Sequence, residues 1–339
     1  MSGLARGVAS GAGLRPRVLG CALGLAVACV CLGFYALGKG TLALAPEQLL
    51  DALLGQGPNA MRLVVMEWRL PRVVAALCLG AALGVSGAIF QSLLRNPLGS
   101  PDILGFNLGA YTGVLVLVVL FKGSVLASTG AAMLGGLLTA GLVYRLAWNG
   151  SLSALRLIVI GLGVRAFLLA VNNWLVTNTT LDTAVSAGLW NAGSLNGVTW
   201  AKAAPALVII GLALIAALLL SRRMRLLEMG DDLACALGVP VERSRLWLLL
   251  AGIALAAAAT AVAGPIAFVA LAAPQIARRL SGGQALALPM AALSGAFLLL
   301  SADFAAQHLL SPYQVPVGLI TVSVGGLYLI ALLIREARR

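Results

Sequence analysis

The sequence predicts an all-α, polytopic membrane protein, and two observations carry that prediction: its composition and the length of its apolar runs. Hydrophobic residues make up 61% of the 339 residues, charged residues only 10%, and the mean hydropathy is +1.02. Soluble domains carry about 25% charged residues, so this composition excludes a water-soluble globule. The apolar runs are continuous over about 20 residues rather than alternating, which favours membrane-spanning helices over a β-barrel.

Apolar runs of helical length give about ten spans. They are expected at roughly 18–38, 70–92, 103–120, 125–148, 154–176, 200–221, 242–263, 265–280, 285–306 and 316–334. The eighth is short, with Gly264-Pro265 at its start and Pro274 inside, so a broken or re-entrant helix is expected there. The whole chain, 1–339, is interpreted as one transmembrane domain with a cytoplasmic loop at about 222–240.

The distribution of basic residues predicts the orientation. With the N-terminus in the cytoplasm, sixteen of the 23 lysines and arginines fall on the cytoplasmic side. One more, Arg165, falls inside a span, and the outside keeps Lys39, Arg62, Arg69, Arg72, Lys122 and Lys202. Both termini are therefore expected in the cytoplasm. The net charge of +12 follows from this bias and does not indicate binding of nucleic acid.

The sequence lacks motifs for ATP hydrolysis, metal binding and redox chemistry. There is no GxxxxGK[ST] loop to hold phosphates, so the chain is not expected to hydrolyse ATP or to bind a cofactor. His308 is the single histidine, and the five cysteines show no CxxC spacing, so neither a metal site nor redox chemistry is expected. Energy for any work must then come from a partner protein or an ion gradient.

The cytoplasmic loop at 222–240 has a distinctive charge pattern. A basic run at 222–225 is followed by Glu228, Asp231 and Asp232. A short amphipathic helix is predicted from Asp231 to Leu237, ended by Gly238, a favourable residue after a helix C-terminus. An exposed short helix with apolar side chains suits docking into a groove of another protein. A solvated turn between two spans is the alternative.

Arg165 lies near the middle of the span at 154–176. A central arginine costs about 2.5–3.5 kcal/mol on insertion scales, so it should face a water-filled path or an opposite charge. Asn172, Asn173 and Trp174 add polar groups toward the outer end of the same helix. Asp303, near the outer end of the ninth span, is the candidate counter-ion. Lining of a pathway and a structural ion pair both remain open.

The motifs together resemble one transporter family. They are RLPR at 69–72, the GxxLGVSGxxxQ…RNPLGSPDILGxxxGA run at 80–110, the loop at 222–240, GPIAF at 264–268 followed by Pro274-Gln275, and Pro316-Val317-Gly318…Thr321…Gly325-Gly326. In this order they resemble the permeases of ABC importers for iron-siderophores and cobalamin, over nearly the whole chain. EWRLPRV, AGLWNAGSLNG and MRLLEMGDDLACALGV are most similar to the branch that carries ferric enterobactin.

The resemblance implies a ten-span permease of the bacterial inner membrane. Its expected partners are a second, related permease in a heterodimer, two ATPase subunits that bind ATP and Mg, and a periplasmic siderophore-binding protein. The expected ligand is a ferric siderophore, ferric enterobactin or a similar catecholate. Another chelate (hydroxamate, haem or cobalamin) is the alternative. An ion-coupled secondary transporter is a further alternative, which would need acids or broken helices at mid-membrane.

The resemblance also assigns roles to residues. It implies ATPase coupling by Leu227, Glu228, Gly230, Asp231, Asp232, Leu237 and Gly238, and docking of the binding protein by Arg69 and Arg72, with Arg62 nearby. The family's further outer arginine, after an Ala-Asp pair, is absent after Ala302-Asp303. The pathway candidates are Arg165, Asn172, Asn173 and Trp174. Asn96, Pro97, Pro101, Gly264 and Pro265 are interpreted as turn-forming residues, because proline lacks an N–H and stops a helix.

Glycines 80, 84 and 87 recur on one predicted helix. Small residues at this spacing let two helices approach closely in a membrane. We therefore expect these glycines to serve helix packing rather than to line a pathway.

Overall fold

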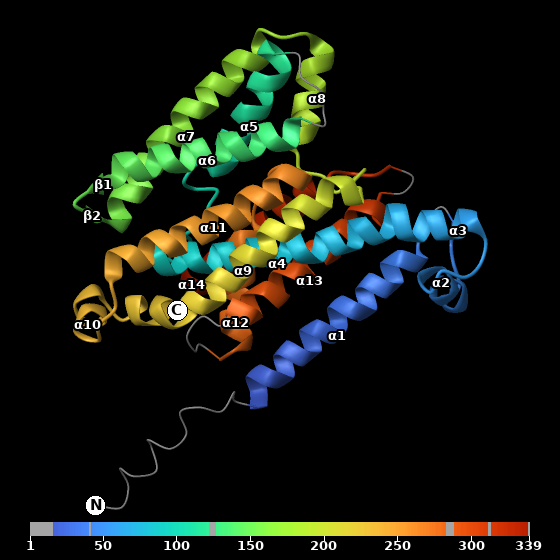
Figure 1. The fold of residues 1–339 in the computed structure, drawn as a ribbon, viewed down its shortest axis with the longest axis horizontal. Coiled ribbons are helices and arrows are strands. Elements are labelled where there is room, and N and C mark those ends of the chain that lie inside the picture. Colours follow the sequence, from blue (N-terminus) through green and yellow to red (C-terminus); the bar gives the residue numbers. More distant parts are fainter. Residues whose placement is uncertain (1–15, 41, 122–126, 283–287, 311–312, 338–339) are drawn as a thin grey trace, which may run out of the picture.

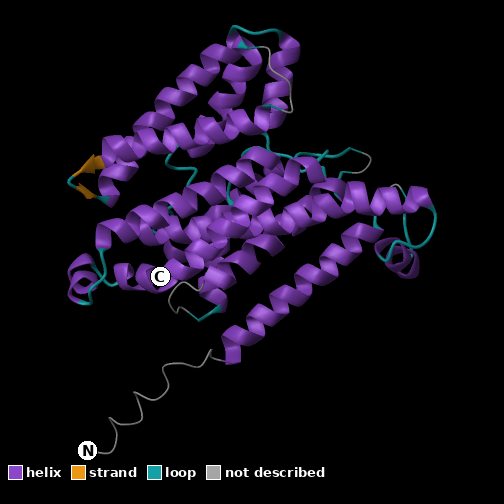
Figure 2. Ribbon diagram, viewed as in Figure 1, coloured by secondary structure: helices purple, strands orange, loops and turns teal. Residues whose placement is uncertain are grey.

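The computed structural model describes residues 16–40, 42–121, 127–282, 288–310 and 313–337, and these residues are almost entirely helical (Figure 1, Figure 2). A helix stands at each of the ten predicted spans: α1 (Pro16–Gly38), α4 (Leu70–Leu93), α5 (Phe106–Leu115) continued by the π-helical η2 (Val116–Leu120), α6 (Ser128–Ala147), α7 (Ala154–Thr177), α9 (Trp200–Glu228), α11 (Val241–Ala263), α12 (Val269–Leu280), α13 (Leu288–His308) and α14 (Val317–Ala337). Seven helices in the described ranges are long and apolar enough to cross a membrane. The all-α, multi-pass prediction is confirmed.

Short elements join these helices, and the sequence did not predict most of them. They are α2 (Pro46–Leu53), α3 (Asn59–Leu63), the π-helical η1 (Val64–Arg69), α8 (Leu181–Asn191), α10 (Asp231–Ala236) and a hairpin of β1 (Trp148–Asn149) with β2 (Ser151–Leu152). The hairpin is antiparallel, with Asn149 opposite Ser151. Residues 125–126 and 285–287 of the predicted spans lie outside the described residues.

The core of the bundle is formed by α4, α11 and α13. α4 packs against α13, α11, α12 and α9, while α1 lies on the outside against α13 (Figure 1). α5, α6, α7 and α8 form a separate group on one side, which meets the core through α6 and α11. Small residues make the closest crossing possible: a side chain at Gly84 would run into the Ala291 carbonyl of α13, and one at Gly80 into the Gly295 carbonyl. The packing role expected for these glycines is confirmed.

Two ends of the bundle differ in charge. α10, the hairpin and the end of α12 lie at one end, opposite α2, α3 and α8 (Figure 1). The start of α1 reaches the same end as α10, where the Cys21 thiol donates to the Leu280 carbonyl. Arg95, Arg245 and Arg278 gather here, as expected for a cytoplasmic end. Arg6, Arg15, Lys122, Arg338 and Arg339 lie outside the described residues.

The eighth span is broken, as expected. α11 ends at Ala263, Gly264 takes a positive φ of 73°, and helical structure resumes only at Val269. Gly264 is needed there because a side chain would collide with the Trp190 carbonyl. Pro274 inside α12 cannot donate to the Ala270 carbonyl four residues earlier. The result is an irregular segment, 264–268, followed by a helix of 12 residues.

Helix α9, at the sixth predicted span, runs further than the sequence predicted. The cytoplasmic loop was expected to begin at residue 222, but α9 continues to Glu228. Met224 and Leu227 are buried, so the apolar face of α9 continues past its arginines and holds the helix against the core. The loop after α9 is therefore shorter than predicted, and it contains α10.

Candidate functional site

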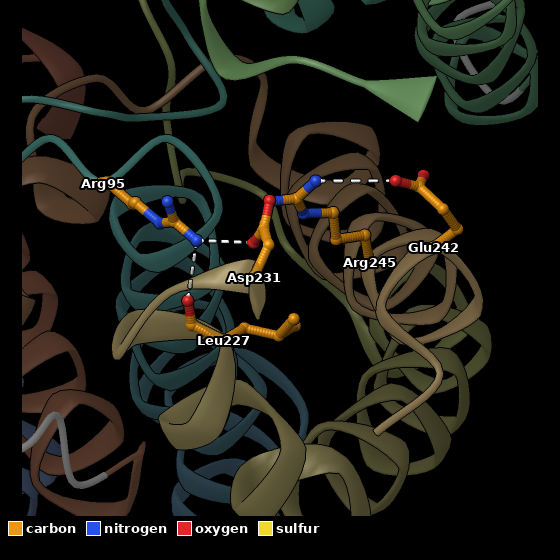
Figure 3. A network of polar contacts seen from close by, with 5 residues as sticks. All are labelled: Arg95, Leu227, Asp231, Glu242 and Arg245. Carbon is orange, nitrogen blue, oxygen red and sulfur yellow. Dashed lines mark hydrogen bonds and ion pairs between the residues drawn. The ribbon is translucent and has the colours of Figure 1, made fainter. Parts of the chain in front are cut away.

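A network of ion pairs and hydrogen bonds surrounds Asp231, the first residue of α10. Arg95 donates to Asp231 Oδ1 at 2.6 Å, and Arg245 donates to both carboxylate oxygens at 2.7 and 2.8 Å (Figure 3). Arg95 also donates to the Leu227 carbonyl at the end of α9, at 3.0 Å. Glu242 lies 3.6 Å from Arg245 and adds a second acid. These contacts fix α10 to α9, to α11 and to the turn that follows α4.

The two ends of α10 are set by glycines. Gly230, before the helix, has a φ of +120° and Gly238, after it, has a φ of +79°. Beyond the helix the Val239 N–H donates back to the Ala234 carbonyl at 2.9 Å, which closes the C-terminus. The predicted helix and its glycine stop are confirmed, with Leu237 as the C-cap rather than the last helical residue.

The outward face of α10 is apolar. Leu233 is 43% exposed and Leu237 is 58% exposed, and Met229, just before the helix, is also exposed. Asp232 and Gly238 are exposed beside them. Exposed leucines at the tip of a projecting helix are typical of a surface that another protein covers.

The predicted coupling residues therefore divide into two groups. Asp232, Leu237 and Gly238 lie on the outside, where a partner could touch them. Leu227 is buried, and Asp231 is engaged inside the chain. The second group positions α10 rather than presenting side chains to a partner.

A second polar network lies behind α10. Burial raises the pKa of Glu228, at the end of α9, while the nearby Ser92 hydroxyl and the charge of Arg278 on α12 act to lower it. Arg278 in turn donates to Gln91 Oε1, and Gln91 Nε2 donates to the Leu271 carbonyl at 3.0 Å. The ends of α4, α9 and α12 are tied together by these contacts.

The turn between α4 and α5, residues 94–105, contains Asn96, Pro97 and Pro101. Asn96 Oδ1 accepts from the Leu98 N–H at 2.9 Å, which forms a tight Asx turn around Pro97. The Pro97 carbonyl accepts from Gln275 of α12 at 3.0 Å. Further along, the Asp102 carboxylate accepts from Asn107. The turn is therefore bonded to α12, a contact that no feature of the sequence predicted.

Burial raises the pKa of the Asp102 carboxyl to about 6, while the positive charge of Arg165 and the Phe268 N–H act to lower the pKa.

The opposite end of the bundle holds the three arginines predicted to dock a binding protein. Arg69 donates to the Leu37 and Leu42 carbonyls at 2.7 and 2.6 Å. Arg72 forms a two-point ion pair with Asp303, which is buried. Arg62 alone of the three is fully exposed. Arg69 and Arg72 are engaged within the chain, so Arg62 is the better placed for docking.

Arg165 lies on the exposed side of α7, close to Asp102. The suggested ion pair between Arg165 and Asp303 is wrong, because Asp303 is bound by Arg72 and by Gln307. α7 packs against α5, α6 and α8, while Asp303 belongs to α13. The exposed side of α7 remains to be covered by a partner or by water.

The other three pathway candidates, Asn172, Asn173 and Trp174, differ in their exposure. Asn172 is buried, where its Oδ1 accepts from the Thr112 hydroxyl at 2.7 Å. Asn173 and Trp174 are exposed. Asn172 therefore ties α7 to α5 and does not contribute to an exposed path, whereas Asn173 can.

Sequence reasoning missed the roles of Arg95, Arg245 and Arg278, which it treated only as cytoplasmic positive charge. The i,i+3 spacing of Glu242 and Arg245 was a usable signal for a local ion pair. Nothing in the sequence linked Arg95 or Arg278 to partners more than 100 residues away. Within the described ranges, no three His, Cys, Asp or Glu side chains form a metal-binding group.

The fold and this site define a polytopic transport permease, and the comparisons agree. The model of the FecCD transport family matches residues 26–335, so the chain belongs to that family. It is 60% identical over 323 residues to the ferric enterobactin transport system permease protein FepG of Escherichia coli K12, covering 95% of this chain and 98% of that protein. It is 39% identical over 313 residues to the iron(3+)-hydroxamate import system permease protein FhuG of Bacillus subtilis 168, covering 89% and 93%.

A solved structure shares the fold. It is described as an inward-facing conformation of a metal-chelate type ABC transporter, and it superposes with a TM-score of 0.81 at 29% identity. The match covers 94% of this chain and 99% of that chain. Nearly the whole chain therefore shares the fold of that transporter chain.

Proposed function

We propose that this chain is a permease subunit of an ABC importer that carries ferric enterobactin, or a similar ferric catecholate, from the periplasm to the cytoplasm across the inner membrane. The observation that carries the proposal is α10, a short helix clasped by Arg95 and Arg245 with exposed leucines at its tip. Such a helix fits the groove of an ATPase subunit, which would bind ATP and Mg. The similarity to FepG supports the choice of chelate.

The proposed assembly has three kinds of partner. A second, related permease would complete the pathway as a heterodimer, two ATPase copies would bind below, and a periplasmic binding protein would deliver the ferric siderophore. The exposed side of α7 supports the need for a second permease, because an arginine facing lipid would be costly. The end with α2 and α3, where Arg62 is exposed, supports docking of the binding protein.

Arg165 is the residue proposed to contact the chelate. A ferric tricatecholate is a large trianion with aromatic faces, and a guanidinium offers both charge and a flat surface that stacks on rings. Asn173 is exposed about two turns further along α7 and extends the proposed path toward the periplasm, whereas Trp174 lies on the opposite side of α7 from Arg165. Asp102 lies within electrostatic reach of Arg165 and partly offsets its positive charge.

Uptake of radioactive iron tests the proposal. A strain that lacks its own catecholate permease is given this chain, and ferric enterobactin, a ferric hydroxamate, haem and cobalamin are offered separately. Uptake of ferric enterobactin alone, dependent on the ATPase, is expected. Uptake of a different chelate would change the substrate and leave the importer assignment intact. Uptake that persists without the ATPase and stops when the ion gradient collapses would instead indicate a secondary transporter.

A further inference from the structure

A polar cavity of about 390 Å³ lies at the end of the bundle opposite α10, next to α8 (Figure 1). It is bounded by the end of α8, the start of α9, the end of α11 and the residues before α14. The lining side chains with polar atoms include Thr129, Trp190, Ser194, Asn196, Lys202 and Gln314. Asn196 and Gln314 are exposed, so the cavity is open to the outer side.

The wall formed by residues 190–194 is held by contacts with the break after α11. The Ser194 N–H donates to the Ala263 carbonyl at 2.6 Å. A side chain at Gly264 would run into the Trp190 carbonyl, so the two backbone segments touch directly. The Trp190 ring stacks on Tyr111, with ring centroids 6.1 Å apart and an angle of 9° between the planes. These contacts give the cavity a preformed wall, as is usual for small-molecule sites.

Lys202, near the start of α9, supplies the charge of this cavity. Of the lining residues in the described ranges, Lys202 alone is charged, and it is half-buried. Arg69 and Arg72, at the same end, are satisfied by carbonyl groups and by Asp303. By contrast, the Lys202 ammonium group forms no ion pair or hydrogen bond within the described part of the chain. Partial burial of an unpaired cation is costly, and an anionic ligand would offset that cost.

The other lining groups suit an aromatic anion. Ser194 Oγ accepts from the Asn196 N–H at 3.1 Å, which leaves the hydroxyl hydrogen free to donate. The side-chain amides of Asn196 and Gln314 add neutral donors, and Trp190 adds aromatic surface. A volume of about 390 Å³ is at the small end of ligand sites, which span about 300–1,000 Å³. The cavity therefore suits one catecholate arm rather than an entire ferric tricatecholate.

We propose that this cavity is a receiving site, in which one catecholate arm of the chelate lies against Lys202 and Trp190 as the chelate leaves the binding protein. The inference rests on the proposed function, because it takes a ferric catecholate as the substrate. α8 bounds the cavity and follows α7, the helix that carries Arg165. Lys202 would thus meet the anionic chelate first and Arg165 would meet it further along the path.

The test measures the maximal rate of ferric enterobactin uptake. The complete complex of both permeases and the ATPase is placed in vesicles of phosphatidylcholine, so that no anionic lipid competes for Lys202. Chelate-loaded binding protein is supplied at saturation, so that docking does not limit the rate. Lys202→Met should lower the maximal rate about tenfold, the affinity that one hydrogen bond to a charged group commonly supplies. Lys202→Arg keeps the charge and should retain most of the rate.

A control and a second measurement separate the receiving site from two other roles. Lys39→Met removes an exposed lysine at the same end that does not line the cavity, and it should leave the maximal rate unchanged. Association of the chelate-free binding protein with the permease pair in nanodiscs should be the same for Lys202→Met and wild type. If Lys202→Met does not assemble with the ATPase, Lys202→Gln takes its place in both measurements.

Three results would overturn the receiving site. They are a normal maximal rate in Lys202→Met, an equal loss in Lys39→Met, and a loss in Lys202→Met that is matched by slower association of the chelate-free binding protein. Failure of the proposed function looks different, since the wild-type complex itself would then not import ferric enterobactin. A wild-type complex that imports the chelate, with Lys202→Met equally active, contradicts only the receiving site.

Discussion

Arg72 and Asp303 form a two-point ion pair at the end of the bundle opposite α10, with Nε–Oδ2 and Nη2–Oδ1 distances of 2.9 and 2.8 Å. The Asp303 side chain is 2% exposed and that of Arg72 is 15% exposed. Gln307 donates a third hydrogen bond to the same carboxylate. The pair fastens the start of α4 to the end of α13, which makes it a structural contact of two core helices.

Breaking this pair should destabilise the protein. Loss of one partner leaves an uncompensated buried charge, at a cost of about 3–5 kcal/mol in comparable pairs. Arg72→Met should therefore lower the midpoint of thermal unfolding in detergent. Arg72→Met with Asp303→Leu should recover much of the loss, because no charge is then left buried. An equal loss in Arg62→Met, an exposed arginine at the same end, would show that the effect is not specific to the pair.

Docking of the binding protein should depend on Arg62. An exposed charge at the rim of an interface acts mainly on the association rate and is screened by salt. Arg62→Glu should slow association with the binding protein at low ionic strength, measured by surface plasmon resonance on permease in nanodiscs. The difference from wild type should shrink at high salt. An unchanged association rate at low salt would remove Arg62 from the docking surface.

ATPase binding should depend on the apolar tip of α10. Leu237→Asp places a charge on a surface that a partner must desolvate, so the ATPase should no longer co-purify with the permease pair. Expression and thermal stability of the permease should not change, since Leu237 is exposed. Leu54→Asp, at an exposed leucine of the opposite end, is the control. Normal recovery of the ATPase with Leu237→Asp would contradict the proposed docking face.

Transport of an anionic chelate should require Arg165. Arg165→Met removes an intramembrane charge and should assemble normally, since the insertion cost is relieved. Uptake of ferric enterobactin should nevertheless fall sharply, and Arg165→Lys should keep part of it, because the charge remains while the flat guanidinium is lost. The measurement is initial uptake rate at equal permease amount. A well-assembled Arg165→Met variant with normal uptake would rule out contact with the chelate.

The sequence predicted the positions of the ten spans well because long apolar runs have few alternatives to helix in a membrane. It also predicted α10, since Gly230, Asp231 and Gly238 mark both of its ends. The outer helices α2 and α8 escaped notice, because short amphipathic segments between spans resemble ordinary loops. The extension of α9 to Glu228 was missed because its arginines were taken to end the helix.

The site was predicted less completely, because most of its contacts are long-range. Arg72 and Asp303 are 231 residues apart and Arg278 and Gln91 are 187 apart, so no spacing in the sequence links them. The side on which Asn172 lies depends on how α7 rotates against α5, which the polarity of Asn173 and Trp174 beside it did not reveal. The positive φ of Phe268, +78°, is likewise visible only in the folded chain.

The seam between α4 and α13 has a consequence for how the molecule can move. At Gly80, Gly84 and Gly295 backbone meets backbone, so no side chains lie between the helices that could change rotamer and allow a gradual slide. The two helices are therefore expected to travel together as a fixed frame. Any rearrangement during a transport cycle is therefore expected around that frame and not within it.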